Sequence, residues 1–112
     1  MKTYCLMLDL KDDPISIAEY KRYHEPANIW PEVVESIKSQ GILKETIFLL
    51  GNRMVMLLQT TDEFSFDTKA AANLANTRMQ EWESLMWKYQ QALPQAKPGE
   101  KWVCMEKIFE VC

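Results

Sequence analysis

Glycine and histidine are both scarce in this chain of 112 residues, which contains three glycines and one histidine. Loops that cradle phosphate groups need closely spaced glycines, so a chain with so few is not expected to contain one. Zinc sites normally use three or four protein ligands, and His24 has no second histidine to act with it. We therefore expect no metal ion at His24.

The chain also lacks paired cysteines and any excess of basic charge. Cys5, Cys104 and Cys112 are odd in number and widely spaced, which indicates neither a disulfide framework nor thiol–histidine catalysis. Its 13 basic and 16 acidic residues are interspersed and give a net charge of −3. Without a basic run we expect no nucleic-acid partner, and without a basic amphipathic segment we expect no membrane partner.

Long hydrophobic runs are missing as well. No apolar stretch approaches the ~20 residues that a membrane-spanning helix needs. The apolar run at the N-terminus gives way to charged residues after Leu10 and offers no small-residue cleavage site, unlike a secretory signal. We therefore expect a cytoplasmic protein.

Hydrophobic residues are nevertheless plentiful, at 47% of the chain, with 11% aromatic. This composition is typical of a globular domain, and the length fits one domain over residues 1–112. Asp13-Pro14 is typical of a helix start, and Gly51-Asn52 of a hairpin turn. The hydrophobic pattern predicts strands at 3–10, 42–50, 53–60 and 102–111, and helices at 14–24, 31–40, 64–76 and 79–93.

When neighbouring helices are merged, the elements follow the order βαββαβ, the ferredoxin-like pattern of an α+β fold. Such a fold has a four-stranded antiparallel sheet with helices on one face. The first strand offers Leu6 and Leu8 to one face and Cys5 and Met7 to the other, so both faces are apolar. We expect a second copy of the chain to cover the open face, sheet against sheet, and to form a homodimeric α/β barrel.

Tyr20 and His24 are four residues apart on the first predicted helix, so their side chains lie on the same face. One interpretation is a hydrogen-bonded pair at the edge of a helix, with a structural role. The other is a catalytic site in which His24 transfers protons and Tyr20 positions it. Histidine suits proton transfer because its ordinary pKa, about 6.5, lies close to neutral pH.

Trp82 and Trp87 lie close together in the last predicted helix. Trp82 falls on an apolar stripe with Met79 and Met86, which is typical of a core-facing helix surface. Trp87 projects away from that stripe. It is therefore either an exposed packing residue or part of a pocket wall, where an aromatic face can stack on the C–H surface of a sugar.

Four short segments occur in order along the chain: Tyr20-x-x-x-His24, IWPE at 29–32, KSQG at 38–41 and WKY at 87–89. Together they resemble the L-rhamnose mutarotase family, which includes L-fucose mutarotases of the same fold. The resemblance spans nearly the whole chain and implies a dimeric α/β barrel. It also implies an isomerase that interconverts the α and β anomers of a 6-deoxyhexose without a cofactor, with His24 catalytic and Tyr20, Met86 and Trp87 in contact with the sugar.

The chain departs from the family pattern in three places. Met86 stands where the family has the first residue of a Trp-Trp pair, and Glu45 stands where a substrate-contacting aromatic is expected. Two extra residues separate His24 from Trp30. These differences fall on the expected pocket wall, so L-rhamnose and L-fucose both remain open as substrates.

The same fold also carries other functions, so two alternatives remain open. Small monooxygenases, including haem-degrading ones, share the dimeric α/β barrel, and in a haem-binding protein His24 would be an axial ligand. Non-catalytic ligand-binding modules share it too, and in such a module a sugar would bind without exchange of its anomers.

Overall fold

Three long strands form the centre of the fold: β1 (Lys2–Leu10), β2 (Ile42–Leu50) and β3 (Arg53–Thr60). In the computed structural model, which describes residues 1–112, they pair antiparallel in the order β2-β3-β1. The predicted bounds of all three strands are confirmed to within a residue. The predicted hairpin turn also forms between β2 and β3, where Gly51 adopts a φ of 63°.

Two short strands, rather than one long strand, occupy the other edge of β1. The first, β4 (Gln90–Gln91), pairs with Asp9 and Leu10, and the second, β5 (Val103–Cys104), pairs with Leu6 and Met7. All these pairings are antiparallel. The α+β class and the antiparallel sheet are therefore confirmed, with the fourth strand position divided between β4 and β5.

Two predicted elements near the C-terminus are wrong in extent. The helix expected at 79–93 ends at Trp87, because the backbone N–H of Lys11 donates to the carbonyl of Tyr89 (2.8 Å) and draws the chain onto the end of β1. The strand expected at 102–111 is reduced to β5. After Met105 donates to the carbonyl of Cys5 (2.7 Å), the exposed tail forms no further strand pairing within the chain.

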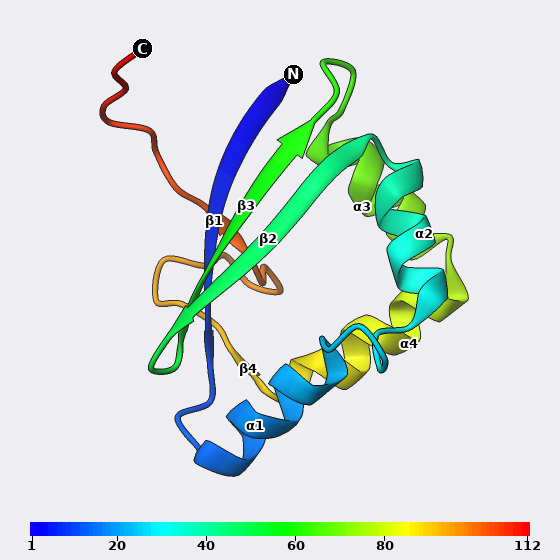
Figure 1. The fold of residues 1–112 in the computed structure, drawn as a ribbon, viewed down its shortest axis with the longest axis vertical. Helices are drawn as coiled ribbons and strands as arrows, with labels where there is room; N and C mark the ends of the chain where they lie inside the picture. The colour runs from blue at the N-terminus through cyan, green and yellow to red at the C-terminus, as the bar shows by residue number, and fades with distance from the viewer.

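Four helices cover one face of the sheet (Figure 1), as predicted. They are α1 (Pro14–Tyr23), α2 (Pro31–Ser39), α3 (Phe66–Leu74) and α4 (Thr77–Trp87). Asp13 caps α1 by accepting the backbone N–H of Ser16 at 3.1 Å, which satisfies a donor that the helix leaves free. None of the four helices is long and apolar enough to cross a membrane.

The core lies between the sheet and the helices. Leu8 and Leu10 of β1 are fully buried there, and Val33 of α2 and Met54 of β3 are almost as well enclosed. The apolar stripe of α4 packs against them, and its members Met79, Trp82 and Met86 are all buried, as the spacing predicted.

The opposite face of the sheet carries no helix (Figure 1). The strand register aligns Cys5 with Leu57 and Met7 with Val55, and it places Phe48 beside Val55. Adjacent residues in the register share a face, so these side chains form one apolar surface. Phe48 is 57% exposed and Leu57 is 39% exposed, so the surface is open to solvent in the single chain.

Replacing Leu8 by alanine should lower the free energy of unfolding by about 2–5 kcal/mol, because it leaves a cavity in a fully buried position of the central strand. Urea unfolding at a fixed protein concentration measures this change. Leu74→Ala is the matched control, since Leu74 is 75% exposed on α3 and should shift stability by less than about 0.5 kcal/mol. Equal effects of the two substitutions would contradict the assignment of the core.

Candidate functional site

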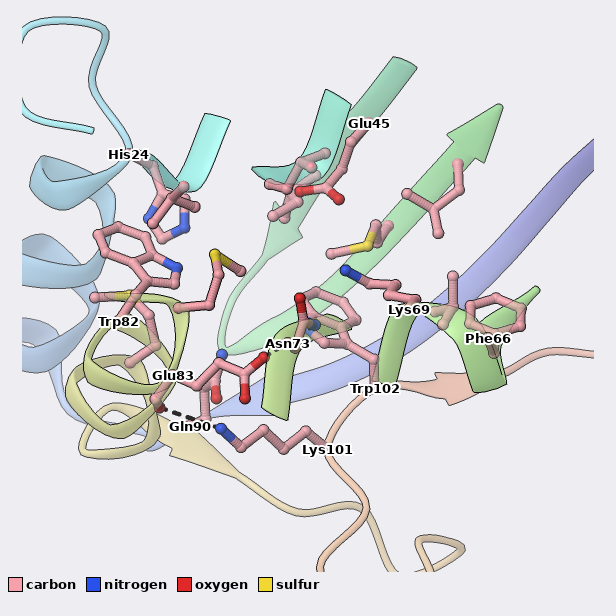
Figure 2. Close-up of a pocket in the computed structure, with 18 of the residues that line it drawn as sticks. His24, Glu45, Phe66, Lys69, Asn73, Trp82, Glu83, Gln90, Lys101 and Trp102 are labelled. Carbon is pink, nitrogen blue, oxygen red and sulfur yellow. Dashed lines mark hydrogen bonds between the residues drawn. The ribbon is translucent and has the colours of Figure 1, made fainter. Parts of the chain in front are cut away.

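A cavity of about 220 Å³ lies between the inner face of the sheet and the helices (Figure 2). It is smaller than the ~300–1,000 Å³ that drug-sized ligands occupy, so it suits a small molecule. Most of its lining is apolar, but polar side chains from every layer of the fold reach it: Tyr20, His24, Glu45, Lys69, Asn73, Glu83, Gln90 and Lys101.

His24 caps the C-terminal end of α1 and is held on three sides. Its Nδ1 lies 2.7 Å from the carbonyl oxygen of Tyr20. Because a carbonyl oxygen can only accept, Nδ1 carries the hydrogen, and in the neutral ring the lone pair is on Nε2. The ring stacks on Tyr20 with centroids 4.4 Å apart and meets the edge of Trp82 at 5.4 Å. The imidazole therefore has one tautomer and one orientation.

Burial sets the charge state of this pair. It lowers the pKa of His24 below its ordinary value of 6.5, and the hydrogen bond to the carbonyl of Tyr20 offsets only part of the effect. Burial also raises the pKa of the Tyr20 phenol to about 12. At neutral pH His24 is therefore an uncharged base, and Tyr20 is an uncharged phenol that can take part in hydrogen bonds only.

Gln90 supports Tyr20 from the floor of the cavity. Its Nε2 donates to the hydroxyl of Tyr20 at 3.2 Å, while its Oε1 has no partner in the chain. The position of Gln90 depends on the pairing of β4 with Leu10. Sequence reasoning missed this residue because it placed Gln90 inside a helix.

The other side of the cavity is charged. Figure 2 shows His24 and Trp82 on one side, and Glu45 from β2 and Lys69 from α3 on the other. Burial raises the pKa of Glu45, and the charge of Lys69 partly opposes this rise. Burial lowers the pKa of Lys69, and the nearby carboxylates of Glu45 and Glu83 partly oppose that.

The predicted sugar-contacting residues separate into two groups. Tyr20, His24 and Met86 all line the cavity, and Met86 is buried. Trp87 does not line it. Trp87 is 40% exposed, and the centre of its ring lies 5.3 Å from the Nζ of Lys101, a residue that does line the cavity. The aromatic side chains in the lining are instead those of Trp82 and Trp102, together with Tyr20 and Phe66.

The extra residues after His24 form a compact turn that stays outside the cavity lining. Backbone N–H groups of Asn28 and Ile29 both donate to the carbonyl of Glu25, at 2.8 and 2.9 Å. The side chain of Asn28 donates to the carbonyl of Arg22 at 3.0 Å. None of these residues lines the cavity that contains His24.

Lys69 and Trp102 are cavity residues that sequence reasoning did not select. Lys69 lies in a segment, DTKAAANL, with no distinguishing pattern, and Trp102 precedes a strand that is much shorter than predicted. Glu45, which the family resemblance assigned to the expected pocket wall, does line the cavity, because alternation along β2 places it on the same face as Ile47, which packs on the core. No group of three or more His, Cys, Asp or Glu side chains is placed to hold a metal ion.

The fold occurs in solved structures of different activities. The L-rhamnose mutarotase of Formosa agariphila superposes with a TM-score of 0.72 at 17% identity, over 99% of both chains. The tetracenomycin F2 cyclase of Streptomyces glaucescens, a type-II polyketide cyclase, superposes with a TM-score of 0.62 at 11% identity, over 100% of this chain and 98% of that one. At such identities the likeness is one of fold.

Sequence comparison is more specific. The L-fucose mutarotase of Xanthomonas campestris pv. campestris is 45% identical over 109 residues, which cover 97% of this chain and 87% of the relative. The family model described as L-rhamnose mutarotase matches residues 3–111, nearly the whole chain. The chain therefore belongs to the L-rhamnose mutarotase family.

Proposed function

We propose that the protein is a mutarotase that interconverts the α and β anomers of a 6-deoxyhexose, L-fucose or L-rhamnose, in the cavity that contains His24. Membership of the family and the 45% identity to an L-fucose mutarotase support this activity. The observation that carries the proposal is the state of His24. Its imidazole is neutral and fixed, and Nε2 makes no hydrogen bond within the chain and is free to bind a substrate proton.

The proposed reaction moves one proton between two oxygen atoms of the sugar. Nε2 of His24 takes the proton of the anomeric hydroxyl, and the resulting imidazolium returns it to the ring oxygen as the bond from that oxygen to C1 breaks. The open-chain aldehyde rotates about C1–C2, and closure on the other face reverses the transfers. A single positioned acid–base group typically contributes roughly 10²–10⁴-fold, which suffices for a reaction that also proceeds in water.

Other residues of the cavity position the sugar and the base. We propose that Tyr20 orients the imidazole through its carbonyl and its stacked ring, and that Met86 packs against apolar C–H groups of the deoxy sugar. Trp82 and Trp102 offer aromatic faces within the lining. Contact of the sugar with Trp87 stays a prediction, because Trp87 is not part of the cavity lining, although its ring lies 5.3 Å from Nζ of the lining residue Lys101.

We also propose that the protein is a homodimer formed through the open faces of two sheets. The apolar surface around Phe48 and Leu57 would lose its contact with water on pairing with a second copy. The exposed Ile108 and Phe109 in the C-terminal tail add apolar area that the single chain does not bury. The three free cysteines are compatible with a reducing compartment, so we place the enzyme in the cytoplasm.

Replacing His24 by alanine or glutamine should reduce the catalysed anomer exchange of L-fucose and L-rhamnose by roughly 10²-fold or more, because it removes the proton carrier. Saturation-transfer NMR of the two anomeric protons measures the exchange rate directly. Glu35→Ala, an exposed substitution on α2, is the control and should keep the wild-type rate.

No acceleration of either sugar by the wild-type protein would overturn the proposed function. Full activity of the His24 variants would overturn the role of His24. Binding of a sugar without exchange would favour a ligand-binding module, and a Soret absorbance band after addition of haem would favour a haem-handling protein.

Replacing Phe48 by aspartate should convert the dimer to a monomer, because it places a charge within the proposed sheet-to-sheet contact. Size-exclusion chromatography with light scattering gives the mass of each variant. Leu74→Asp is the matched control, since this leucine is 75% exposed on the helical side, and it should leave the dimer intact. A wild-type monomer, or an intact dimer in the Phe48 variant, would contradict the proposed interface.

A further inference from the structure

Glu45 is the one cavity carboxylate that the chain leaves without a hydrogen-bond partner. The register pairs Glu45 with Leu58, a buried residue of β3, so the side chain of Glu45 turns towards the helices and away from the open face. Only burial and the charge of Lys69 act on its pKa, and no hydrogen bond contributes. A carboxylate in such a place is costly unless a donor reaches it.

Lys69 is held in place beside Glu45 by a chain of hydrogen bonds. Its Nζ donates to Oε1 of Gln40 at 2.9 Å, and Nε2 of Gln40 donates to Oδ1 of Asn73 at 2.7 Å. Nδ2 of Asn73 in turn donates to Oε1 of Glu83 at 3.3 Å. This network uses one of the three donors of the ammonium group of Lys69 and leaves two without a partner in the chain. Figure 2 shows that the nitrogen of Lys69 points into the cavity.

The charges of the cavity indicate the class of ligand. Two carboxylates, Glu45 and Glu83, and two ammonium groups, Lys69 and Lys101, line it. Their charges cancel, and His24 is neutral at pH 7, so the cavity favours neither an anion nor a cation. Free acceptors and free donors side by side fit a neutral molecule with several hydroxyl groups.

We propose that Glu45 and Lys69 form the hydroxyl-reading end of the cavity and determine which sugar is bound productively. The carboxylate of Glu45 accepts a hydrogen bond from one sugar hydroxyl, and the ammonium group of Lys69 donates to a neighbouring one. These contacts hold the ring with its anomeric carbon at His24, on the opposite side of the cavity. The inference rests on the proposed function and names residues that set its substrate specificity.

Such a pair discriminates by hydroxyl orientation. A sugar whose hydroxyl points elsewhere, or is missing, leaves a buried charge without its partner, and that loss is larger than the loss of a neutral hydrogen bond. L-Fucose and L-rhamnose differ only in the orientation of their ring hydroxyls. The pair can therefore separate them by the positions of their hydroxyl groups.

The test is Glu45→Gln, which keeps the shape of the side chain and removes its charge. Anomer exchange is measured by NMR for L-fucose, for L-rhamnose and for analogues of the better substrate that each lack one ring hydroxyl. We expect the variant to raise KM for the better substrate by about 10- to 100-fold, with kcat within a few-fold of wild type. Glu63→Gln, an exposed glutamate, is the matched control and should leave both constants unchanged.

The hydroxyl that Glu45 binds is identified by the analogue series. With the wild-type protein, one analogue should have a much lower kcat/KM than the complete sugar. Glu45→Gln should lower kcat/KM for that analogue little further, because the missing hydroxyl and the missing carboxylate remove the same interaction. Lys69→Met should weaken binding in the same way, with the loss on a neighbouring hydroxyl. An unchanged KM, or an equal loss for every sugar and analogue, would overturn the proposal.

Two controls keep the result interpretable. The melting temperature of the Glu45 variant shows that it is folded at the assay temperature, which matters because Glu45→Gln also removes the charge beside the ammonium group of Lys69. If the wild-type protein binds these sugars but does not exchange their anomers, the proposed function fails. The role of Glu45 is then decided by the dissociation constants: Glu45→Gln should raise Kd for the sugar that binds more tightly, and Glu63→Gln should leave it unchanged. Quenching of Trp82 and Trp102 fluorescence by the sugar gives that Kd.

Discussion

The hydrogen bond from Nδ1 of His24 to the carbonyl of Tyr20 is the contact on which the site depends. It closes the last turn of α1 with the side chain of the residue that ends the helix, and it fixes the tautomer of the imidazole. Stacking on Tyr20 and the edge contact with Trp82 then restrict rotation of the ring. A base that is already oriented loses little conformational freedom when the substrate binds, which favours proton transfer.

The cavity has two ends with different electrostatics, and each suits a different task. Around His24 the surroundings are aromatic and keep the imidazole neutral. Around Glu45 and Lys69, burial disfavours the charged form of each side chain, and the opposite charge of the other side chain partly offsets that cost. The fold produces this division simply, because α1 and α4 supply the first end while β2 and α3 supply the second. A sugar that spans the cavity meets the proton carrier at one side and the hydroxyl-binding charges at the other.

The sequence predicted what depends on local pattern and missed what depends on tertiary contacts. Helical spacing placed Tyr20 next to His24, and the hydrophobic pattern located the three long strands, because both signals are local. The early end of α4 arises from pairing of β4 with β1, between residues about 80 positions apart, which no local pattern contains. Lys69 becomes a cavity residue only because α3 packs against α4, and Trp87 lies outside the lining because the apolar stripe of α4 faces the core instead.

The proposed reaction requires His24 to be a neutral base with its free lone pair on Nε2. Because the chain has a single histidine, ¹⁵N NMR of imidazole-labelled protein reports this residue without ambiguity. At pH 7 we expect a protonated Nδ1 and an unprotonated Nε2 whose signal shifts when L-fucose or L-rhamnose is added, and we expect the titration to give a pKa below 6.5 for His24. A hydrogen on Nε2 at pH 7, or an Nε2 signal that no sugar changes, would contradict the proposed reaction.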